Sequence, residues 1–316
     1  MSRQLEYLGK GHPFSHFHSS PFSLLGTLFY EVEQPYQMTK AHMLQKEKLI
    51  HDIFCESEPC KQKFISKKIP KSQLWEKIKV QVMIRLDFEK FSQNPKLLHY
   101  LISTGEQYLL ENNIRDPFWG IPQNHAGKIL MKLRSHFVGE QKLPDTIIIG
   151  DSFLRDVNGN NIKLNSQVIS LSGVRLGYLF QAVKFITGTF VKYVVVLGGM
   201  NDLSTDENRA RMGPKQLAKV VAEFEKVFTE LSPRAVLIIC SVLTRPGGEG
   251  RVHTHIKRYN QLLVNMKNNF SSQKVRVLEF QDLTAEHFSD GLHVSDKGTI
   301  YLENKIKEAL NDCVEQ

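Results

Sequence analysis

Polar groups in the carboxy-terminal half of the chain have the residue types that ester cleavage needs. Ser152 ends the segment Gly-Asp-Ser after the apolar run TIII, and a serine becomes a nucleophile when a base removes its proton. Asp290 stands three residues before His293 in a glycine-containing turn, where its carboxylate can orient the imidazole that would act as this base. The amide of Asn201 and the backbone N–H near Gly173 could donate to an oxyanion. These groups predict acyl transfer by a serine hydrolase.

Regular elements must bring these distant groups together. Apolar runs at residues 146–149, 168–171, 194–197, 236–240 and 275–278 read as buried strands, and amphipathic stretches at 214–231, 256–267 and 295–310 read as helices. This alternation predicts parallel strands with crossover helices, which form a three-layer α/β domain. Open parallel sheets place their chemistry at the carboxyl edge of the strands, so we expect the polar groups to gather there.

The segment from about Pro144 to Gln316 resembles the SGNH (GDSL-type) hydrolase superfamily, whose four blocks occur here in order. They are Gly150-Asp151-Ser152, Gly173, Gly199-Met200-Asn201-Asp202 and Asp290-Gly291-Leu292-His293. The resemblance implies an α/β/α flavodoxin-like sandwich that needs no metal. It makes Ser152 the nucleophile, His293 the base and Asp290 its orienting group, with Gly173, Asn201 and the Ser152 N–H forming the oxyanion hole. No long hydrophobic lid is evident, so we expect a small acyl ester as substrate.

The amino-terminal half offers groups that could cleave an N-glycosidic bond. Such cleavage passes through an oxocarbenium-like state, which a carboxylate such as Glu33 or Asp116 would stabilise while Trp119 stacks on the base. Lys40 allows two interpretations. Its ammonium could contact a phosphate, or its amine could react with a ribose aldehyde if its pKa were depressed.

Apolar residues before residue 139 recur mostly at helical spacing. Leu74, Ile78, Val82 and Leu86 form an i, i+4 stripe after Ser72, which is a suitable N-cap. A second helix is predicted from Asn94-Pro95 to near Gly105. The pattern changes at residues 139–145, so we predict two domains, 1–140 and 141–316.

Residues from about Pro13 to Val138 resemble the NADAR family, which is similar to bacterial riboflavin-pathway N-glycosidases. The matching elements are Pro13-Phe14-Ser15-His16-Phe17, the segment from Val32 to Lys40, Trp75, Lys79, Val82-Met83, Lys90-Phe91, Leu110-Glu111, Asp116-x-x-Trp119-Gly120, Asn124-x-x-Gly127, Leu130-Met131 and Arg134. The resemblance implies a mainly helical α+β domain that binds a compound of the ADP-ribose or ribose-phosphate type. It makes Glu33 and Asp116 catalytic and Phe17, Lys40 and Trp119 substrate-binding.

The chain departs from the family pattern at three places. Gln34 stands where the family has a histidine, His16 where it has an asparagine, and the glycine-rich loop is shortened to residues 119–124. The lost glycines remove backbone N–H groups that could hold phosphate. Two hypotheses therefore stay open: a bifunctional hydrolase with an N-glycosidase and an esterase domain, or an esterase recruited by a non-catalytic NADAR-like adaptor.

Composition limits the partners and the compartment. The 316 residues carry a net charge of +8, and the stretch Lys61–Lys79 is strongly basic, so it reads either as a solvated helix face or as a contact for nucleic acid. Four cysteines are too few and too scattered for a disulfide scaffold or a four-thiolate zinc site. No apolar run is long enough to span a membrane, and the amino terminus lacks the apolar region of a secretory signal. We expect a cytoplasmic or nuclear protein without a cofactor. Its oligomeric state is not predicted.

Overall fold

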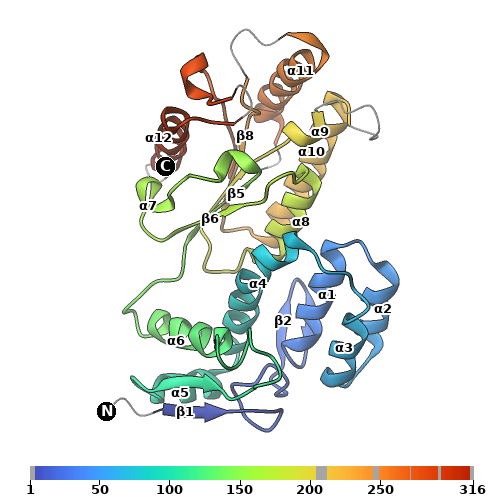
Figure 1. The fold of residues 1–316 in the computed structure, drawn as a ribbon, viewed down its shortest axis with the longest axis vertical. Helices are drawn as coiled ribbons and strands as arrows, with labels where there is room; N and C mark the ends of the chain where they lie inside the picture. The colour runs from blue at the N-terminus through green and yellow to red at the C-terminus, as the bar shows by residue number, and fades with distance from the viewer. Residues whose placement is uncertain (1–3, 204–211, 245–248, 271, 291–292, 314–316) are drawn as a thin grey trace. The chain divides into compact units, whose positions relative to one another are not determined.

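The computed structural model describes residues 4–203, 212–244, 249–270, 272–290 and 293–313. The chain divides into two compact units, residues 1–143 and 144–316 (Figure 1). The division lies a few residues after the boundary expected from the sequence.

The unit 1–143 is mainly helical, which confirms the predicted α+β class. Strand β1 (Gln4–Tyr7) pairs in parallel with β4 (Tyr108–Glu111), and β2 (Phe22–Leu24) pairs antiparallel with β3 (Thr27–Phe29). The helices in the described part of this unit are α1 (Glu33–Met43), α2 (Glu47–Cys55), α3 (Pro59–Ser66), α4 (Gln73–Ser92), α5 (Pro95–Ser103) and α6 (His125–Phe137).

Helix α4 is the central element of this unit. Ser72 caps it as predicted, because its Oγ accepts a hydrogen bond from Trp75 N at 3.4 Å. Its carboxy-terminal half is buried on every side, since all residues from Val82 to Phe91 are buried. More of this helix is buried than the apolar stripe in the sequence predicts. Four charged side chains of α4 are also buried: Arg85, Asp87, Glu89 and Lys90.

The unit 144–316 contains a five-stranded parallel sheet, as predicted. The strands lie in the order β6 (Ser166–Ser170), β5 (Thr146–Gly150), β7 (Tyr193–Leu197), β8 (Val236–Cys240) and β9 (Val275–Leu278). This is the 2-1-3-4-5 order of flavodoxin-like sheets, which confirms the expected fold class.

Helices cover both faces of this sheet. The short helix α7 (Gly159–Ile162) packs against α12 (Asp296–Asn311) on one face, while α8 (Leu176–Ile186), α10 (Pro214–Leu231) and α11 (Gly250–Met266) lie on the other (Figure 1). The short helix α9 (Met200–Leu203) follows β7. In the core, Ile148, Val195 and Ile238 of neighbouring strands pack against Leu302 and Ile306 of α12. Among the described residues, no helix is both long enough and apolar enough for a membrane crossing.

Candidate active sites

Helix α1 presents four side chains along one face. Glu33, Tyr36, Gln37 and Lys40 occupy positions i, i+3, i+4 and i+7, the spacing at which side chains share a helix face. All four line one pocket. Glu33 is the first residue of α1, where the positive end of the helix dipole favours a carboxylate. The geometry of one helix thus delivers a carboxylate, a phenol, an amide and an amine to the same cavity.

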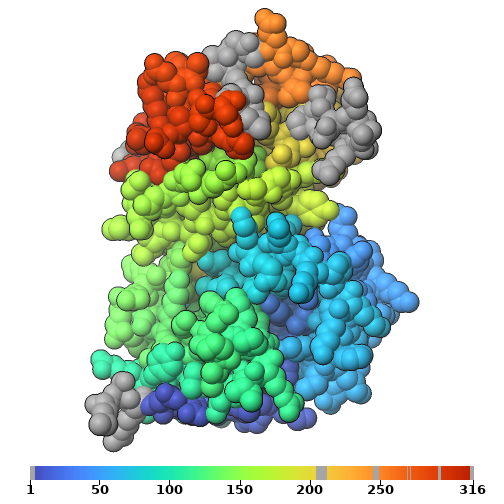
Figure 2. Space-filling view, viewed as in Figure 1, coloured from blue at the N-terminus to red at the C-terminus, as the bar shows by residue number. Residues whose placement is uncertain are grey.

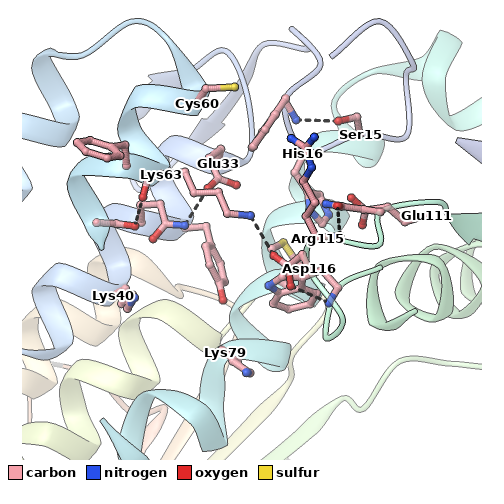
Figure 3. Close-up of a pocket in the computed structure, with 18 of the residues that line it drawn as sticks. Ser15, His16, Glu33, Lys40, Cys60, Lys63, Lys79, Glu111, Arg115 and Asp116 are labelled. Carbon is pink, nitrogen blue, oxygen red and sulfur yellow. Dashed lines mark hydrogen bonds and ion pairs between the residues drawn. The ribbon is translucent and has the colours of Figure 1, made fainter. Parts of the chain in front are cut away.

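This pocket gathers all five residues that the sequence suggested for the amino-terminal half. Phe17, Glu33, Lys40, Asp116 and Trp119 line a cavity of about 1110 Å³ within the unit 1–143 (Figure 3). Figure 2 shows the surface hollowed between the light-blue atoms of α3 and the green atoms of the segment before α6. A cavity of this size can hold a ligand as large as a nucleotide sugar.

The ammonium of Lys63 interacts with two carboxylates of the pocket, those of Asp116 and Glu33. Lys63 Nζ donates to Asp116 Oδ2 at 3.0 Å, and Gln37 Nε2 donates to Glu33 Oε1 at 2.8 Å. Burial raises the pKa of Glu33, although Lys63 and Gln37 counteract it. Burial also lowers the pKa of Lys63, but the nearby Glu33 and Asp116 outweigh it, so the pKa of Lys63 is raised. Such surroundings suit a carboxyl group that exchanges a proton during a reaction.

Aromatic rings supply the apolar walls. The Trp119 ring stands edge-on to Tyr36 at a centroid distance of 5.7 Å and to His16 at 6.2 Å. Lys63 Nζ lies 5.9 Å from the centroid of the Phe17 ring. A planar base could pack against walls of this kind while the polar groups contact the sugar.

Lys40 lies half-buried at the pocket, seven residues along α1 from Glu33. Burial lowers the pKa of its amine, which increases the neutral, nucleophilic fraction. In the described part of the chain, no hydrogen bond or ion pair engages its Nζ. Both interpretations of Lys40 stay predictions.

Sequence reasoning gave no role to several of the residues that line the pocket. Lys63 and Lys67 line the pocket although the sequence showed them only as part of a basic stretch, and Lys79, one of the elements matching the family pattern, lines it too. The i, i+4 spacing of Lys63 and Lys67 was the available signal that these two lysines share a face. Glu111 and His16 also line the pocket. Burial raises the pKa of Glu111, whose Oε2 has no hydrogen-bond partner among the described atoms.

Lys90 fixes the loop that carries His16 and Phe17. Its fully buried Nζ donates to the carbonyl oxygens of Pro13 at 2.8 Å and Ser15 at 2.9 Å. Burial lowers the pKa of Lys90 to about 8. This lysine therefore positions one wall of the pocket from inside the core.

Gln34 lies outside the pocket lining, and only Trp119 of the shortened loop 119–124 belongs to that lining. Gln34 Nε2 donates to the carbonyl oxygens of Phe54 at 3.1 Å and Glu56 at 3.3 Å, at the end of α2. Asn124, which ends the shortened loop, accepts from Glu111 N at 3.0 Å and donates to Leu109 O at 2.9 Å. Gln34 thus supports α2, and the loop is tied to β4.

In the unit 144–316, Ser152 begins a short 3-10 helix directly after β5. A Cβ atom on Gly150 would lie 2.3 Å from Leu197 O, so only glycine fits at the end of this strand. Asp151 caps the short helix, because its Oδ1 accepts from Phe153 N at 3.1 Å. Burial, with a contribution from Asp202, raises the pKa of Asp151 to about 7.

The loops that carry the predicted oxyanion donors are joined to each other. Asn201 Nδ2 donates to Val174 O at 2.9 Å, and Asp202 Oδ2 accepts from Leu176 N at 2.9 Å. Gly173 has φ +72° with no atom within 4 Å of an added Cβ, so its backbone conformation rather than crowding favours glycine. The structure therefore brings the segments of Gly173 and Asn201 together.

Asp290 and His293 form the predicted pair. Asp290 Oδ2 lies 2.8 Å from His293 Nδ1, and Asp290 Oδ1 accepts from His293 N at 2.7 Å. The contact at Nδ1 leaves Nε2 as the nitrogen that could take a proton from a serine.

Packing brings the segments of Ser152 and His293 to one hydrophobic cluster. Phe153, next to Ser152, belongs to it, and Val294, next to His293, packs against it. In addition, Glu303 of α12 accepts from Asn158 N at 2.7 Å, which ties the last helix to the segment after Ser152. No hydrogen bond joins Ser152 to His293 within the described residues, so the complete triad stays a prediction.

Comparison with known proteins identifies the first unit. Residues 7–138 match the NADAR domain. The chain is 31% identical over 136 residues to N-glycosidase R617 of Acanthamoeba polyphaga mimivirus, which covers 35% of this chain and 78% of that protein. It is 38% identical over 74 residues to the chloroplastic riboflavin biosynthesis protein PYRR of Arabidopsis thaliana, which covers 22% of this chain but only 12% of that protein.

Solved structures resemble each half. The NMR structure of YbiA from E. coli shares 26% identity and a TM-score of 0.40, covering 44% of this chain and 88% of that one. The crystal structure of a GDSL-like lipase from Bacteroides thetaiotaomicron shares 18% identity and a TM-score of 0.42, covering 53% of this chain and 88% of that one.

The domain match covers the pocket-bearing unit. The elements that the sequence shares with the family, from Pro13 to Arg134, lie within residues 7–138. Because this chain is 31% identical to the mimivirus N-glycosidase and covers 78% of that protein, the chain belongs to the NADAR family.

Proposed function

We propose that this protein is a two-domain hydrolase. Its NADAR domain would cleave the N-glycosidic bond of a phosphorylated ribose compound, of the ADP-ribose or ribose-phosphate type. Its second domain would hydrolyse a small acyl ester through Ser152. The observation that carries the first activity is the buried carboxyl of Glu33, which faces a large pocket together with Lys63 and Asp116. The mimivirus relative, which is named an N-glycosidase, supports it.

The pocket can stabilise the charges of this reaction. As the bond between sugar and base lengthens, positive charge develops on the ribose, and the carboxylate of Glu33 offsets it. Trp119 and Tyr36 would contact the base. Lys67 and Arg115 also line the pocket and would attract the phosphate.

Base release tests this proposal. Purified protein is incubated with N-ribosyl phosphates and ADP-ribosyl compounds, and the free base is separated by chromatography. Glu33→Gln should lower the rate by about 100-fold or more, since it removes the stabilising charge. Glu47→Gln is the matched control, because Glu47 is an exposed residue in the first turn of the next helix. An unchanged rate in Glu33→Gln would refute the glycosidase assignment.

Borohydride treatment during turnover separates the two roles of Lys40. If its amine adds to the open-chain ribose aldehyde and water leaves, the resulting imine is reduced to a stable adduct on Lys40. If its ammonium only contacts phosphate, no adduct forms and Lys40→Ala raises KM.

The second activity rests on the Asp290–His293 pair and on the position of Ser152 after β5. His293 would take the proton of Ser152, and Asn201 with nearby backbone N–H groups would receive the oxyanion. A fluorophosphonate probe should label the wild type but not Ser152→Ala, and His293→Ala should react far more slowly. Ser232→Ala is the control, since Ser232 precedes β8 at the opposite end of the strands. Equal labelling of Ser152→Ala would refute the assignment.

An adaptor role is the alternative for the first domain. Lys61, Lys68 and Lys71 are exposed and could hold a nucleic acid through its phosphates. Binding of nucleic acid without base release, weakening steeply with salt, would favour this role.

All four cysteines are free thiols, which supports a reducing compartment such as the cytoplasm or nucleus.

A further inference from the structure

His16 occupies a position in the pocket where the NADAR pattern has an asparagine. It is 8% exposed, and its Nε2 lies 3.2 Å from Oδ2 of Asp87 in α4. Its ring stands edge-on to Trp119. Asparagine can only donate and accept hydrogen bonds, whereas histidine also transfers protons near neutral pH. His16 thus gives the pocket a side chain that can transfer a proton.

The surroundings of His16 favour its protonated form. Asp87 is fully buried, and its Oδ1 has no hydrogen-bond partner among the described atoms. A buried carboxylate of this kind needs a neighbouring cation, and His16 is its hydrogen-bonded partner. The other charged groups that face His16 are Glu111 of β4, Lys90 of α4 and Glu33 of α1. Burial lowers the pKa of His16, but Asp87 and Glu111 outweigh burial and Lys90, so the pKa is raised.

The backbone fixes His16 next to Glu33. The carbonyl oxygen of His16 accepts hydrogen bonds from Val32 N at 3.1 Å and from Glu33 N at 3.2 Å. Both side chains line the same pocket (Figure 3). Asp87 holds Nε2, and no hydrogen bond engages Nδ1 within the described residues. Nδ1 is therefore the ring nitrogen that a ligand can meet.

We propose that His16 is a catalytic residue that protonates the departing base in the NADAR pocket, with Asp87 as its positioning residue. This inference rests on the proposed N-glycosidase activity. The bond between C1′ and the base nitrogen breaks, and its electron pair stays on the nitrogen, which receives the proton from His16 Nδ1. Water adds to C1′ and gives its proton to the carboxylate of Glu33. Exchange with solvent then returns His16 and Glu33 to their starting states.

The proposal predicts which substrates depend on His16. A neutral purine or pyrimidine N-riboside would release an anionic base unless the nitrogen is protonated as it leaves. The base of a nicotinamide N-riboside carries a positive charge and leaves as a neutral molecule without a proton. General acid catalysis contributes about 10²–10⁴-fold, so only the first class should lose this factor when His16 is removed.

The experiment compares His16→Asn and His16→Gln with the wild type on both substrate classes, across pH. We expect kcat on the neutral N-riboside to fall at least about 100-fold, and kcat on the nicotinamide compound to change less than about threefold. The wild-type rate on the neutral substrate should decline as pH rises through the raised pKa of His16, and Asp87→Asn should move this decline to lower pH. His18→Asn is the control, since His18 contacts Ser20 and does not line the pocket.

The outcomes separate this inference from the proposed function. Failure of the wild type to release base from either class overturns the proposed function. A wild type active on both classes, with His16 variants that keep its rate and pH profile, overturns the role of His16 alone. Equal loss on both classes by folded variants also overturns it, because binding rather than proton donation would then be affected. If His16→Asn does not fold, the pH profile of Asp87→Asn tests the role of His16: a decline in rate at the same pH as in the wild type would overturn it.

Discussion

Replacing Asp151 with asparagine should stabilise the unit 144–316, and the gain should grow with pH. Asp151 is 1% exposed, and burial raises its pKa from the ordinary 3.8 to about 7. Since the folded chain holds this proton more tightly than the unfolded chain, stability is lost as pH rises between these two values. At about 1.4 kcal/mol per pH unit, the buried carboxyl of Asp151 costs nothing at pH 3 and about 2 kcal/mol at pH 5, where it stays protonated only in the folded chain, and up to about 4 kcal/mol at pH 8, where it is ionised in both states. Asparagine keeps the acceptor for Phe153 N and carries no charge.

The assay must report on the second unit alone. The two tryptophans of the chain, Trp75 and Trp119, lie in the unit 1–143, so their fluorescence follows only that unit. Hydrogen exchange of peptides from β5 and β7 measures the opening free energy of the other unit. Asp156→Asn is the control, because Asp156 is exposed. A stability difference between Asp151→Asn and the wild type that is the same at pH 5 and pH 8 would refute the reasoning.

Three further predictions concern the unit 1–143, and its tryptophan fluorescence during denaturation by urea measures each effect on stability. Lys90→Met leaves the buried Ser15 carbonyl and the part-buried Pro13 carbonyl without their donor and should lower stability by about 1–3 kcal/mol for the buried carbonyl alone. Gly127→Ala places a Cβ 2.1 Å from Leu109 O and should cost about 2 kcal/mol or more, whereas Gly139→Ala, with φ +84° and open space, should cost only about 1 kcal/mol. Gln34→Ala should lower stability by about 1 kcal/mol yet leave base release within about twofold of the wild type, since Gln34 supports α2 rather than the pocket; a large loss of base release would contradict this placement.

The sheet of the second unit was predictable because buried parallel strands are continuous apolar runs. TIIIG, YVVVL and VLIIC are such runs, and the observed strands begin and end close to the predicted limits. Helix α8 was not predicted. Its buried residues Leu176, Leu179, Phe180, Val183 and Ile186 do recur at helical spacing, so the sequence held a signal for this helix that the strand-like apolar runs around it obscured. The hydrogen bond from Asn201 to Val174 depends on loop conformations that no periodicity reveals.

The first unit was less predictable for two physical reasons. Its strands have three or four residues, too few to show alternation, and β1 pairs with β4 across about a hundred residues of sequence. The ion pair between Lys63 and Asp116 spans 53 residues, so the sequence shows the lysine only among other lysines. The chemistry of the residue types and the resemblance to a known family, rather than periodicity, placed Glu33 and Trp119 among the candidate residues.

The burial of four charged residues in α4 has a consequence for folding. Consider a partly folded form in which α4 stays buried while the Pro13–Phe17 loop detaches. In that form Lys90 would lose the Pro13 carbonyl and Asp87 would lose His16. Intermediates of that kind are energetically penalised, because an uncompensated charge in a nonpolar interior is far more costly than a missing contact. The loop and α4 should therefore dissociate together in a single all-or-none step, which keeps one wall of the pocket assembled for as long as the domain remains native.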